Sequence, residues 1–286
     1  MAETTRFAPS PTGLLHLGHA YAAWFAQDAA AGGRVLLRLE DIDRSRCREE
    51  FVAGILEDLA WLGLSWEEPV RRQSQHLQDY RAALDRLAAA GLLYPCFCSR
   101  GDIAAAGSAP QGPDGPIYPG ICRALPAAEI DQRLASGAAY ALRLDMARAT
   151  SGMAPLRFTD REAGTIDAVP AQFGDVVLAR KDVPTSYHLA VTVDDAAQGV
   201  TLVTRGRDLL PATHLHRLLQ ALLDVPVPDY HHHRLITDAS GRRLAKRDAD
   251  LTLASLRQSG ASPAELRARL ARAPLSRNDN NSDISD

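Results

Sequence analysis

Apolar and polar positions divide the chain into short apolar runs and longer amphipathic stretches. A short continuous apolar run is typical of a buried strand, whereas apolar residues three and four positions apart are typical of a helix. Residues 48–62 show the second pattern, since Phe51, Ile55, Leu59 and Leu62 fall on one helical face. In the first half of the chain, strands are predicted over 4–8 and 34–41, and helices over 19–31, 48–62 and 75–90.

The second half continues this alternation but contains two stretches without it. Residues 107–120 are rich in glycine and proline and are expected to form an irregular loop. Residues 275–286 are polar and are predicted to be disordered, because they hold little apolar surface to bury. Strands are predicted over 92–99, 140–145, 173–180, 199–206 and 228–237, and helices over 211–223, 251–258 and 263–272.

Alternation of apolar strands with helices predicts an α/β fold, a parallel sheet with helices on both faces. Length, composition and net charge indicate the number of domains and the kinds of partner to expect. The chain has 286 residues with 46% hydrophobic positions and a formal net charge of −3. Its length suggests one or two domains. Because the net charge is slightly negative, the chain as a whole lacks the excess of basic residues that indicates nucleic-acid binding. Since we find neither an apolar signal segment nor a run long enough to span a membrane, we expect a cytoplasmic protein without a membrane partner.

The loop at residues 9–18, PSPTGLLHLG, follows the first predicted strand and leads into a helix. Ligands of parallel sheets bind at the carboxyl ends of strands, and a helix N-terminus offers free amide hydrogens to anions. His16 and His19 add donors, so this segment is suited to a triphosphate. On this evidence alone a plain surface loop is the competing interpretation, because neither a Walker motif nor a three-glycine dinucleotide motif is present.

Three of the four cysteines cluster in the sequence, at Cys96, Cys98 and Cys122, and Cys47 stands apart. This arrangement is unlike a secreted disulfide framework and favours reduced thiols. The spacing leaves two interpretations open for the cluster, a zinc site and buried free thiols. Cys47 is interpreted as structural.

Two short motifs resemble the signatures of class I aminoacyl-tRNA synthetases. HLGH at residues 16–19 is similar to the first signature, HIGH, and RLAKR at residues 243–247 to the second, KMSKS. The stretches RFAPSPTG, LLRLEDIDRSR, PTSYHLAVTVDDAAQGVTLVTRGRDLL and YHHHRLITDASGRRLAKRD together resemble the glutamyl branch of that class. Only residues 251–286 follow the second signature, so the chain resembles the short glutamyl-queuosine tRNA(Asp) synthetase family, and no anticodon-binding domain is expected.

The resemblance implies a Rossmann-like class I catalytic domain with a zinc-stapled insertion and a small helical C-terminal part. The implied function is activation of L-glutamate by ATP without tRNA, followed by transfer to the queuosine of tRNA(Asp), by a monomer. The expected division is a first catalytic half over 1–94, the insertion over 95–124, a second catalytic half over 125–230, the second signature and helical part over 231–274, and the tail over 275–286.

The resemblance also assigns residues to roles. His16, His19 and Lys246 are implied as catalytic groups on the phosphates of ATP, with Gly18 in the same site. Arg6 and Arg205 are implied as partners of the glutamate carboxylates and Glu40 as partner of the amino group. Ala8 and Ser10 would line that pocket, and Tyr187 would add a hydroxyl. Arg243 and Ala245 depart from the usual second signature, which puts the fine phosphate geometry in doubt more than the role of Lys246.

Two metals are implied by the same resemblance. One structural Zn²⁺ would be held by Cys96, Cys98, Tyr118 and Cys122, and Mg²⁺ would accompany ATP. Two other functions stay open: a minimal glutamyl-tRNA synthetase that charges the 3′ end of tRNA(Glu), and a non-catalytic zinc module that binds RNA.

Three further groups of polar residues could bind a metal or RNA, but a structural role is the favoured interpretation for each. His231, His232 and His233 are consecutive on a predicted strand, so their side chains should alternate between faces rather than converge on a metal. The aspartates at 41, 43, 194 and 195 are interpreted as helix caps and ion pairs. The arginines at 267, 269 and 272 are interpreted as a solvated face rather than an RNA contact.

Overall fold

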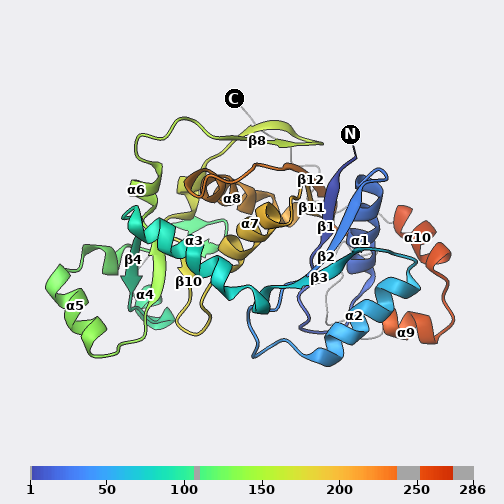
Figure 1. The fold of residues 1–286 in the computed structure, drawn as a ribbon, viewed down its shortest axis with the longest axis horizontal. Helices are drawn as coiled ribbons and strands as arrows, with labels where there is room; N and C mark the ends of the chain where they lie inside the picture. The colour runs from blue at the N-terminus through green and yellow to red at the C-terminus, as the bar shows by residue number, and fades with distance from the viewer. Residues whose placement is uncertain (1, 106–109, 237–251, 273–286) are drawn as a thin grey trace.

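A parallel sheet of the first three strands carries the N-terminal motif. Its strand order is β1–β2–β3, and helices α1 and α2 form the connections. These elements lie on the right-hand side of the computed structural model, which describes residues 2–105, 110–236 and 252–272 (Figure 1). They are β1 (Thr4–Phe7), α1 (Leu17–Ala29), β2 (Arg34–Leu39), α2 (Glu49–Trp61) and β3 (Glu67–Arg72).

A second sheet lies beside the first. Its order is β11–β12–β8–β9, with the first three strands parallel and β9 antiparallel to β8. The backbone N–H of Thr201 donates to the carbonyl oxygen of Thr4 at 3.0 Å, which joins the start of β11 to β1. The elements are β8 (Arg157–Asp160), β9 (Gly164–Asp167), α7 (Tyr187–Ala197), β11 (Leu202–Gly206), α8 (Leu210–Leu222) and β12 (Asp229–His233).

An antiparallel sheet in the order β10–β7–β4 forms the opposite end of the molecule, where Figure 1 shows α4 and α5 beside it. Its strands are β4 (Leu93–Cys96), β7 (Ala141–Leu144) and β10 (Val177–Ala179). The other elements are α3 (Leu77–Ala89), α4 (Arg100–Ala105), β5 (Gln111–Gly112), β6 (Gly115–Pro116), α5 (Ala127–Ala135), α6 (Met146–Thr150), and four 3₁₀ turns at Gln73–Gln75, Ile121–Ala124, Pro170–Phe173 and Arg207–Leu209.

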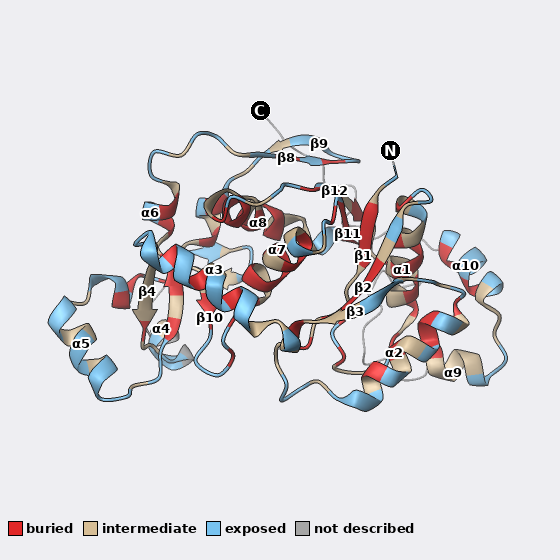
Figure 2. Ribbon diagram, viewed as in Figure 1, coloured by how far each residue is buried: buried red, intermediate tan, exposed pale blue. Residues whose placement is uncertain are grey.

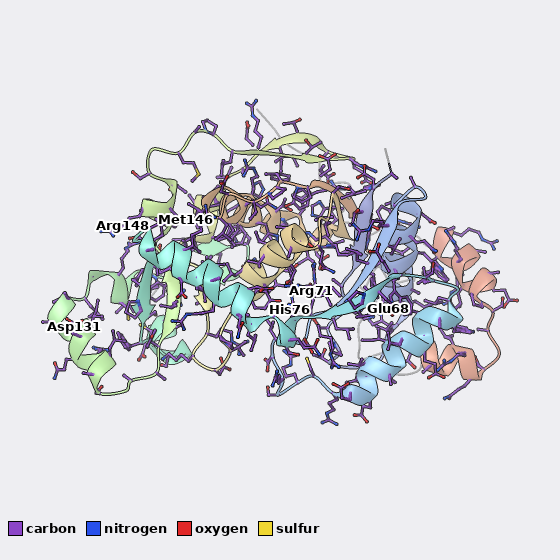
Figure 3. All side chains as sticks on the ribbon, viewed as in Figure 1. Glu68, Arg71, His76, Asp131, Met146 and Arg148 are labelled. Atoms are coloured by element: carbon purple, nitrogen blue, oxygen red, sulfur yellow. The ribbon has the colours of Figure 1, made fainter. Side chains whose placement is uncertain are left out.

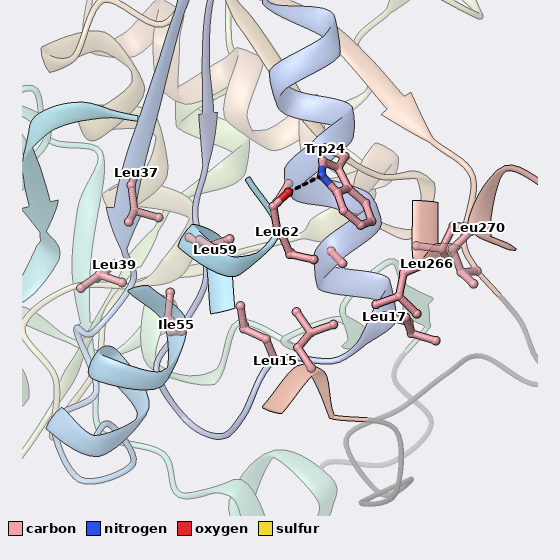
Figure 4. Packing of buried hydrophobic residues seen from close by; sticks show 14 of the residues in the cluster. Leu15, Leu17, Trp24, Leu37, Leu39, Ile55, Leu59, Leu62, Leu266 and Leu270 are labelled. Carbon is pink, nitrogen blue, oxygen red and sulfur yellow. Dashed lines mark hydrogen bonds between the residues drawn. The ribbon is translucent and has the colours of Figure 1, made fainter. Parts of the chain in front are cut away.

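The core beneath the N-terminal sheet joins the two ends of the sequence. Leu266 and Leu270 of α10 (Pro263–Ala271) belong to the same buried cluster as Leu17 and Trp24 of α1 (Figure 4). The indole N–H of Trp24 donates to the carbonyl oxygen of Leu62 at 3.3 Å, so this buried polar group is satisfied. Figure 2 shows the buried positions concentrated on the inward faces of the sheets and of α1, α7 and α8. The last helices therefore stabilise the region that begins the chain.

Most predicted strands and helices are confirmed, and so is the parallel sheet with its connecting helices. Strands β4, β7, β10 and β9 add antiparallel pairs, one expectation is wrong, and several elements were not predicted. Residues 107–120 are not irregular throughout, since β5 and β6 form a short hairpin. The helix α7, together with β3, α5, α6, β8 and β9, has no counterpart among the predicted elements. Within the described ranges, no helix has the length and apolar character that a membrane crossing requires.

Candidate active site

A cleft of about 710 Å³ opens where the carboxyl ends of β1, β2, β11 and β12 meet the start of α1. This is the edge at which parallel α/β sheets bind their ligands. Nine residues that the sequence assigned to the site line the cleft: Arg6, Ala8, Ser10, His16, Gly18, His19, Glu40, Tyr187 and Arg205. His233 of the histidine triplet, which was not assigned to the site, lines it as well. The volume lies in the range of small-molecule sites, about 300–1,000 Å³.

His16 and His19 cap the N-terminus of α1 with their imidazole rings. The Nδ1 atom of His16 accepts from the backbone N–H of Gly18, and the Nδ1 atom of His19 accepts from the backbone N–H of His16, both at 3.1 Å. A ring nitrogen that accepts carries no proton, so each imidazole is neutral and bears its proton on Nε2. A Cβ at Gly18 would stand 3.0 Å from the His16 ring. The glycine thus lets the ring lie close over the helix start.

Residues on both sides of 237–251 lie at this cleft. Ile236 lines it, and Thr252 forms an antiparallel bridge with His16. The backbone N–H of Leu253, the first residue of α9 (Leu253–Gln258), donates to the carbonyl oxygen of Leu15 at 2.8 Å. The second signature, with Arg243, Ala245 and Lys246, lies outside the described residues.

Arg6 and Glu40 are held by a buried ion-pair network under the cleft. Asp195 of α7 accepts from Arg6 Nε at 3.0 Å and from Arg38 Nη1 at 2.7 Å, both through Oδ1. Arg38 Nη2 stands 3.5 Å from Glu40 Oε1, and the Arg38 side chain is 0% exposed. Burial raises the pKa of Glu40, and the neighbouring Arg38 offsets part of that effect. Burial also acts to raise the pKa of Asp195, but Arg6 and Arg38 outweigh it and the pKa is lowered.

Asp194, the neighbour of Asp195, extends the network toward β3 and α3. It accepts from Arg71 Nε at 2.8 Å, from the amide of Gln73 at 2.8 Å, and from the hydroxyl of Tyr80 at 3.0 Å. Figure 3 labels Arg71 at the end of β3. Burial and the neighbouring carboxylate raise the pKa of Tyr80, so its hydroxyl keeps the proton that it donates. The ion-pair reading of Asp194 and Asp195 is confirmed.

Arg205, at the carboxyl half of β11, is held differently from Arg6. Its Nε donates to His232 Nε2 at 3.1 Å, its Nη2 to the hydroxyl of Thr213 at 2.6 Å, and its Nη1 contacts His216 Nδ1 at 3.1 Å. Within the described ranges no carboxylate lies within ion-pair distance of this guanidinium. Sequence reasoning did not single out His216 or Thr213. Their spacing of three on α8, facing a strand that carries an arginine, is the signal that could have found them.

The histidine triplet is divided between two faces of β12, as its position on a strand predicts. His232 Nδ1 lies 2.7 Å from Asp160 Oδ2, whereas the rings of His231 and His233 lie against Phe25. His233 Nδ1 lies 2.9 Å from the carbonyl oxygen of Arg234, so it donates there and its Nε2 is left as an acceptor. That atom is buried in the cleft wall and makes no hydrogen bond in the described part of the chain.

The predicted zinc ligands converge at the distal antiparallel sheet. The Sγ atoms of Cys96, Cys98 and Cys122 lie within 4.8 Å of one another. The Tyr118 hydroxyl oxygen is 3.4 Å from both Cys96 Sγ and Cys98 Sγ, and Cys98 Sγ is 3.4 Å from Cys122 Sγ. Ligands at tetrahedral corners around zinc, with bonds of about 2.3 Å, would be separated by about 3.8 Å. The geometry and the soft donor set therefore fit a closed zinc site.

Burial keeps protons on two ligand groups of this cluster when no cation is bound. Burial raises the pKa of the Cys98 thiol to about 11, and burial raises the pKa of the Tyr118 phenol as well. A bound metal ion supplies the positive charge that holds such groups deprotonated. The backbone N–H of Cys122 donates to the Tyr118 oxygen at 2.8 Å, and the Arg143 guanidinium lies 3.8 Å from the ring centroid of Tyr118. Both contacts favour negative charge on that oxygen.

Two further charged groups that the sequence singled out, Asp41 and Arg267, have structural partners. Asp41 accepts from the backbone N–H and hydroxyl of Ser74 at 2.7 and 2.8 Å. Arg267 pairs with Asp28 at 2.5 Å, which ties α10 to α1 rather than leaving that arginine for a ligand.

Comparison with known proteins places the chain among tRNA synthetases. Residues 3–285 match the family model described as tRNA synthetases class I (E and Q), catalytic domain. The chain is 53% identical over 272 residues to a glutamyl-Q tRNA(Asp) synthetase of Rhodobacter capsulatus, with 92% of this chain and 98% of that protein covered. A glutamyl-Q tRNA(Asp) synthetase of Symbiobacterium thermophilum is 44% identical, with 93% and 84% covered.

A solved structure shows the same arrangement of elements. A glutamate tRNA ligase from Elizabethkingia meningosepticum, crystallised in complex with its amino acid, superposes with a TM-score of 0.71 at 29% identity. The similarity covers 87% of this chain and 53% of that one, so this chain spans about half the length of the solved protein.

Proposed function

Because the chain belongs to the class I tRNA synthetases (E and Q), as its two signatures indicated, we propose that it is a ligase that activates glutamate with ATP and transfers it to the queuosine of tRNA(Asp). In the first step a glutamate carboxylate oxygen bonds to the α-phosphorus of ATP and pyrophosphate leaves. In the second step a hydroxyl of the acceptor attacks the glutamyl carbonyl carbon and AMP leaves. Neither step requires a covalent bond to the enzyme.

The ATP phosphates are assigned to the N-terminus of α1. The Nε2–H donors of His16 and His19 and the helix dipole favour anionic oxygens at that place. Lys246 is proposed to neutralise the departing pyrophosphate. Two flanking positions support this role, since Ile236 lines the cleft and Thr252 pairs with His16, which also lines it.

The glutamate is assigned to the other end of the cleft. Arg6 and Arg205 are the cations available to its two carboxylates, Glu40 is the anion available to its ammonium group, and the Tyr187 hydroxyl is a polar partner beside them. Catalysis then consists of positioning and of stabilising charge on phosphate oxygens. That the two sets of side chains line one cleft is the observation that carries the proposed function.

One structural zinc held by Cys96, Cys98, Tyr118 and Cys122 would brace the insertion over 95–124. Mg²⁺ would arrive on ATP, where it neutralises phosphate charge. Among the described residues, the cysteine cluster is the one group of three or more potential ligands, so no protein cage for Mg²⁺ is proposed. The other expected domain bounds, 1–94, 125–230, 231–274 and 275–286, the monomeric state and the cytoplasmic location form part of the proposal.

Exchange of radiolabelled pyrophosphate into ATP tests the first step. We expect exchange that requires glutamate and does not require tRNA. Lys246→Ala should abolish exchange while RNA binding persists, whereas a non-catalytic RNA-binding module would show no exchange in any variant.

Transfer of labelled glutamate tests the acceptor. Matched substrates are tRNA(Asp) with queuosine, the same tRNA without its 3′-terminal adenosine, an unmodified tRNA(Asp) transcript, and tRNA(Glu). We expect labelling of the first two only. Labelling of tRNA(Glu), lost when its terminal adenosine is removed, would instead identify an enzyme that charges the 3′ end.

A further inference from the structure

Arg205 stands at the centre of two hydrogen-bonded chains that end on carboxylates. One chain runs from Arg205 through His232 to Asp160, with an Nδ1–Oδ2 distance of 2.7 Å at its end. The other runs through His216 to His188 Nδ1 at 3.0 Å, and from His188 Nε2 to Asp114 Oδ2 at 2.9 Å.

The chemistry of the two ends fixes every proton between them. A guanidinium can only donate and a carboxylate can only accept, so each imidazole must accept on the side of Arg205 and donate on the other. His232 therefore carries its proton on Nδ1, and His216 and His188 carry theirs on Nε2. A second proton on His232 or His216 would remove an acceptor from Arg205. Both rings must be neutral for these chains to exist.

The burial of the rings supports the same charge state. His232 is 1% exposed and His216 is 3% exposed. Burial, with the neighbouring Arg205, holds the pKa of His216 well below its usual range. Burial lowers the pKa of His232 to about 4, although Asp160 acts in the opposite direction.

The consequence is an arginine whose position is fixed but whose charge is not cancelled by direct contact. Arg205 uses three of its five N–H donors on neutral acceptors, which leaves one on each terminal nitrogen. Arg6 differs, because it forms a direct ion pair with Asp195 at 3.0 Å. A carboxylate of the substrate would thus find its strongest unshared positive charge at Arg205.

Resting on the proposed function, we propose that His216 and His232 are positioning residues for glutamate, which hold Arg205 through neutral acceptors and so reserve its charge for a substrate carboxylate. The charge of Arg205 thereby stays available to one of the two carboxylates of glutamate. A carboxylate at either position would hold Arg205 equally well but would take its charge.

The matched pair His216→Asn and His216→Asp tests this. The side-chain oxygen of each replaces Nδ1 at the same number of bonds from the backbone. The two side chains have nearly the same shape and differ in charge and in the amide N–H donors of asparagine. In glutamate-dependent ATP–pyrophosphate exchange, we expect His216→Asp to raise the KM for glutamate at least about tenfold over His216→Asn. The kcat should change less than about threefold and the KM for ATP should stay constant.

Equal KM values for glutamate in the two variants would overturn the inference and leave the proposed function standing. Absence of glutamate-dependent exchange by the wild-type chain would overturn both. If His216→Asp does not fold, His188→Leu and His188→Asn form the second pair, because only asparagine can accept the Nε2–H of His216. The leucine variant should show the higher KM for glutamate by about threefold. Equal values in that pair would again contradict the inference.

Discussion

Asp195 accepts the Nε–H of Arg6 through an oxygen that also accepts from Arg38, and neither Asp195 nor Arg6 is more than 10% exposed. Asp195→Asn removes the charge that both guanidiniums share. Removing one partner of a buried ion pair typically costs about 3–5 kcal/mol, because the other charge is left buried and unpaired. We expect the free energy of unfolding, measured with urea, to fall by this amount. The KM for glutamate in ATP–pyrophosphate exchange should rise.

The control for this variant is Asp167→Asn, which breaks the exposed pair between Asp167 and Arg157. Pairs in water contribute little, so stability should barely change. If the two variants lost similar stability, the network beneath the cleft would not be under the strong electrostatic control that we infer.

Zinc is expected to be bound at one ion per chain, as measured by metal analysis of the purified protein. Cys98→Ser should lose the metal, because its sulfur stands within 3.4 Å of both Tyr118 and Cys122. Since structural zinc binding is coupled to folding, the melting temperature should fall and chelator should produce the same fall in the wild type. Cys47→Ser is the control and should retain one zinc. A metal-free wild type with an unchanged melting temperature would show that the thiols are simply buried.

The sequence located the site better than it located the elements around it. Nine predicted residues meet at one cleft because the motifs follow strands, and the carboxyl ends of parallel strands share an edge. Local pattern was sufficient there, since each motif lies within a few residues of its strand.

Helix α7 shows what local pattern could not supply. Its β-branched residues Val191, Thr192 and Val193 disfavour a helix, and Asp194 and Asp195 are polar where a core helix would be apolar. The aspartates are buried because arginines from β1, β2 and β3, more than a hundred residues away in sequence, pair with them. Likewise, the partners of Arg205 come from α8 and β12, and no spacing in the sequence assigns proton positions to His216 and His232.

Gly33 immediately precedes β2 and lies against the backbone of Glu3. A Cβ at Gly33 would stand 2.1 Å from the carbonyl oxygen of Glu3 and 2.6 Å from its nitrogen, and neither backbone atom can move without disturbing β1. We expect Gly33→Ala to destabilise the fold by at least about 3 kcal/mol in urea unfolding. Its neighbour Gly32 has a positive φ of +81° and open space around it, so Gly32→Ala should cost only about 1 kcal/mol. A smaller loss for Gly33→Ala than for Gly32→Ala would mean that β1 and β2 are not in this close register.

Asp58 of α2 is buried against α9, and its ionisation makes the stability of the fold depend on pH. Its carboxylate oxygens accept no hydrogen bond within the described ranges, and Arg257 lies 3.6 Å away. Burial raises the pKa of Asp58 to about 6. The folded state therefore holds this proton more tightly than the unfolded state does, and folding loses stability as the pH rises from about 4 through 6. Above that range the carboxylate is ionised in both states, and the loss of stability is complete.

Asp58→Asn removes the titrating group and keeps its shape. Relative to this variant, we expect the wild type to lose about 1–3 kcal/mol in free energy of unfolding between pH 4.5 and pH 7.5, measured by urea unfolding at several pH values. Glu57→Gln serves as the control, because the Glu57 carboxylate pairs with the same Arg257 but is 66% exposed. Its difference from the wild type should stay nearly constant over that range. A constant difference for Asp58→Asn as well would show that the carboxylate is solvated, and hence that α9 does not cover it in solution.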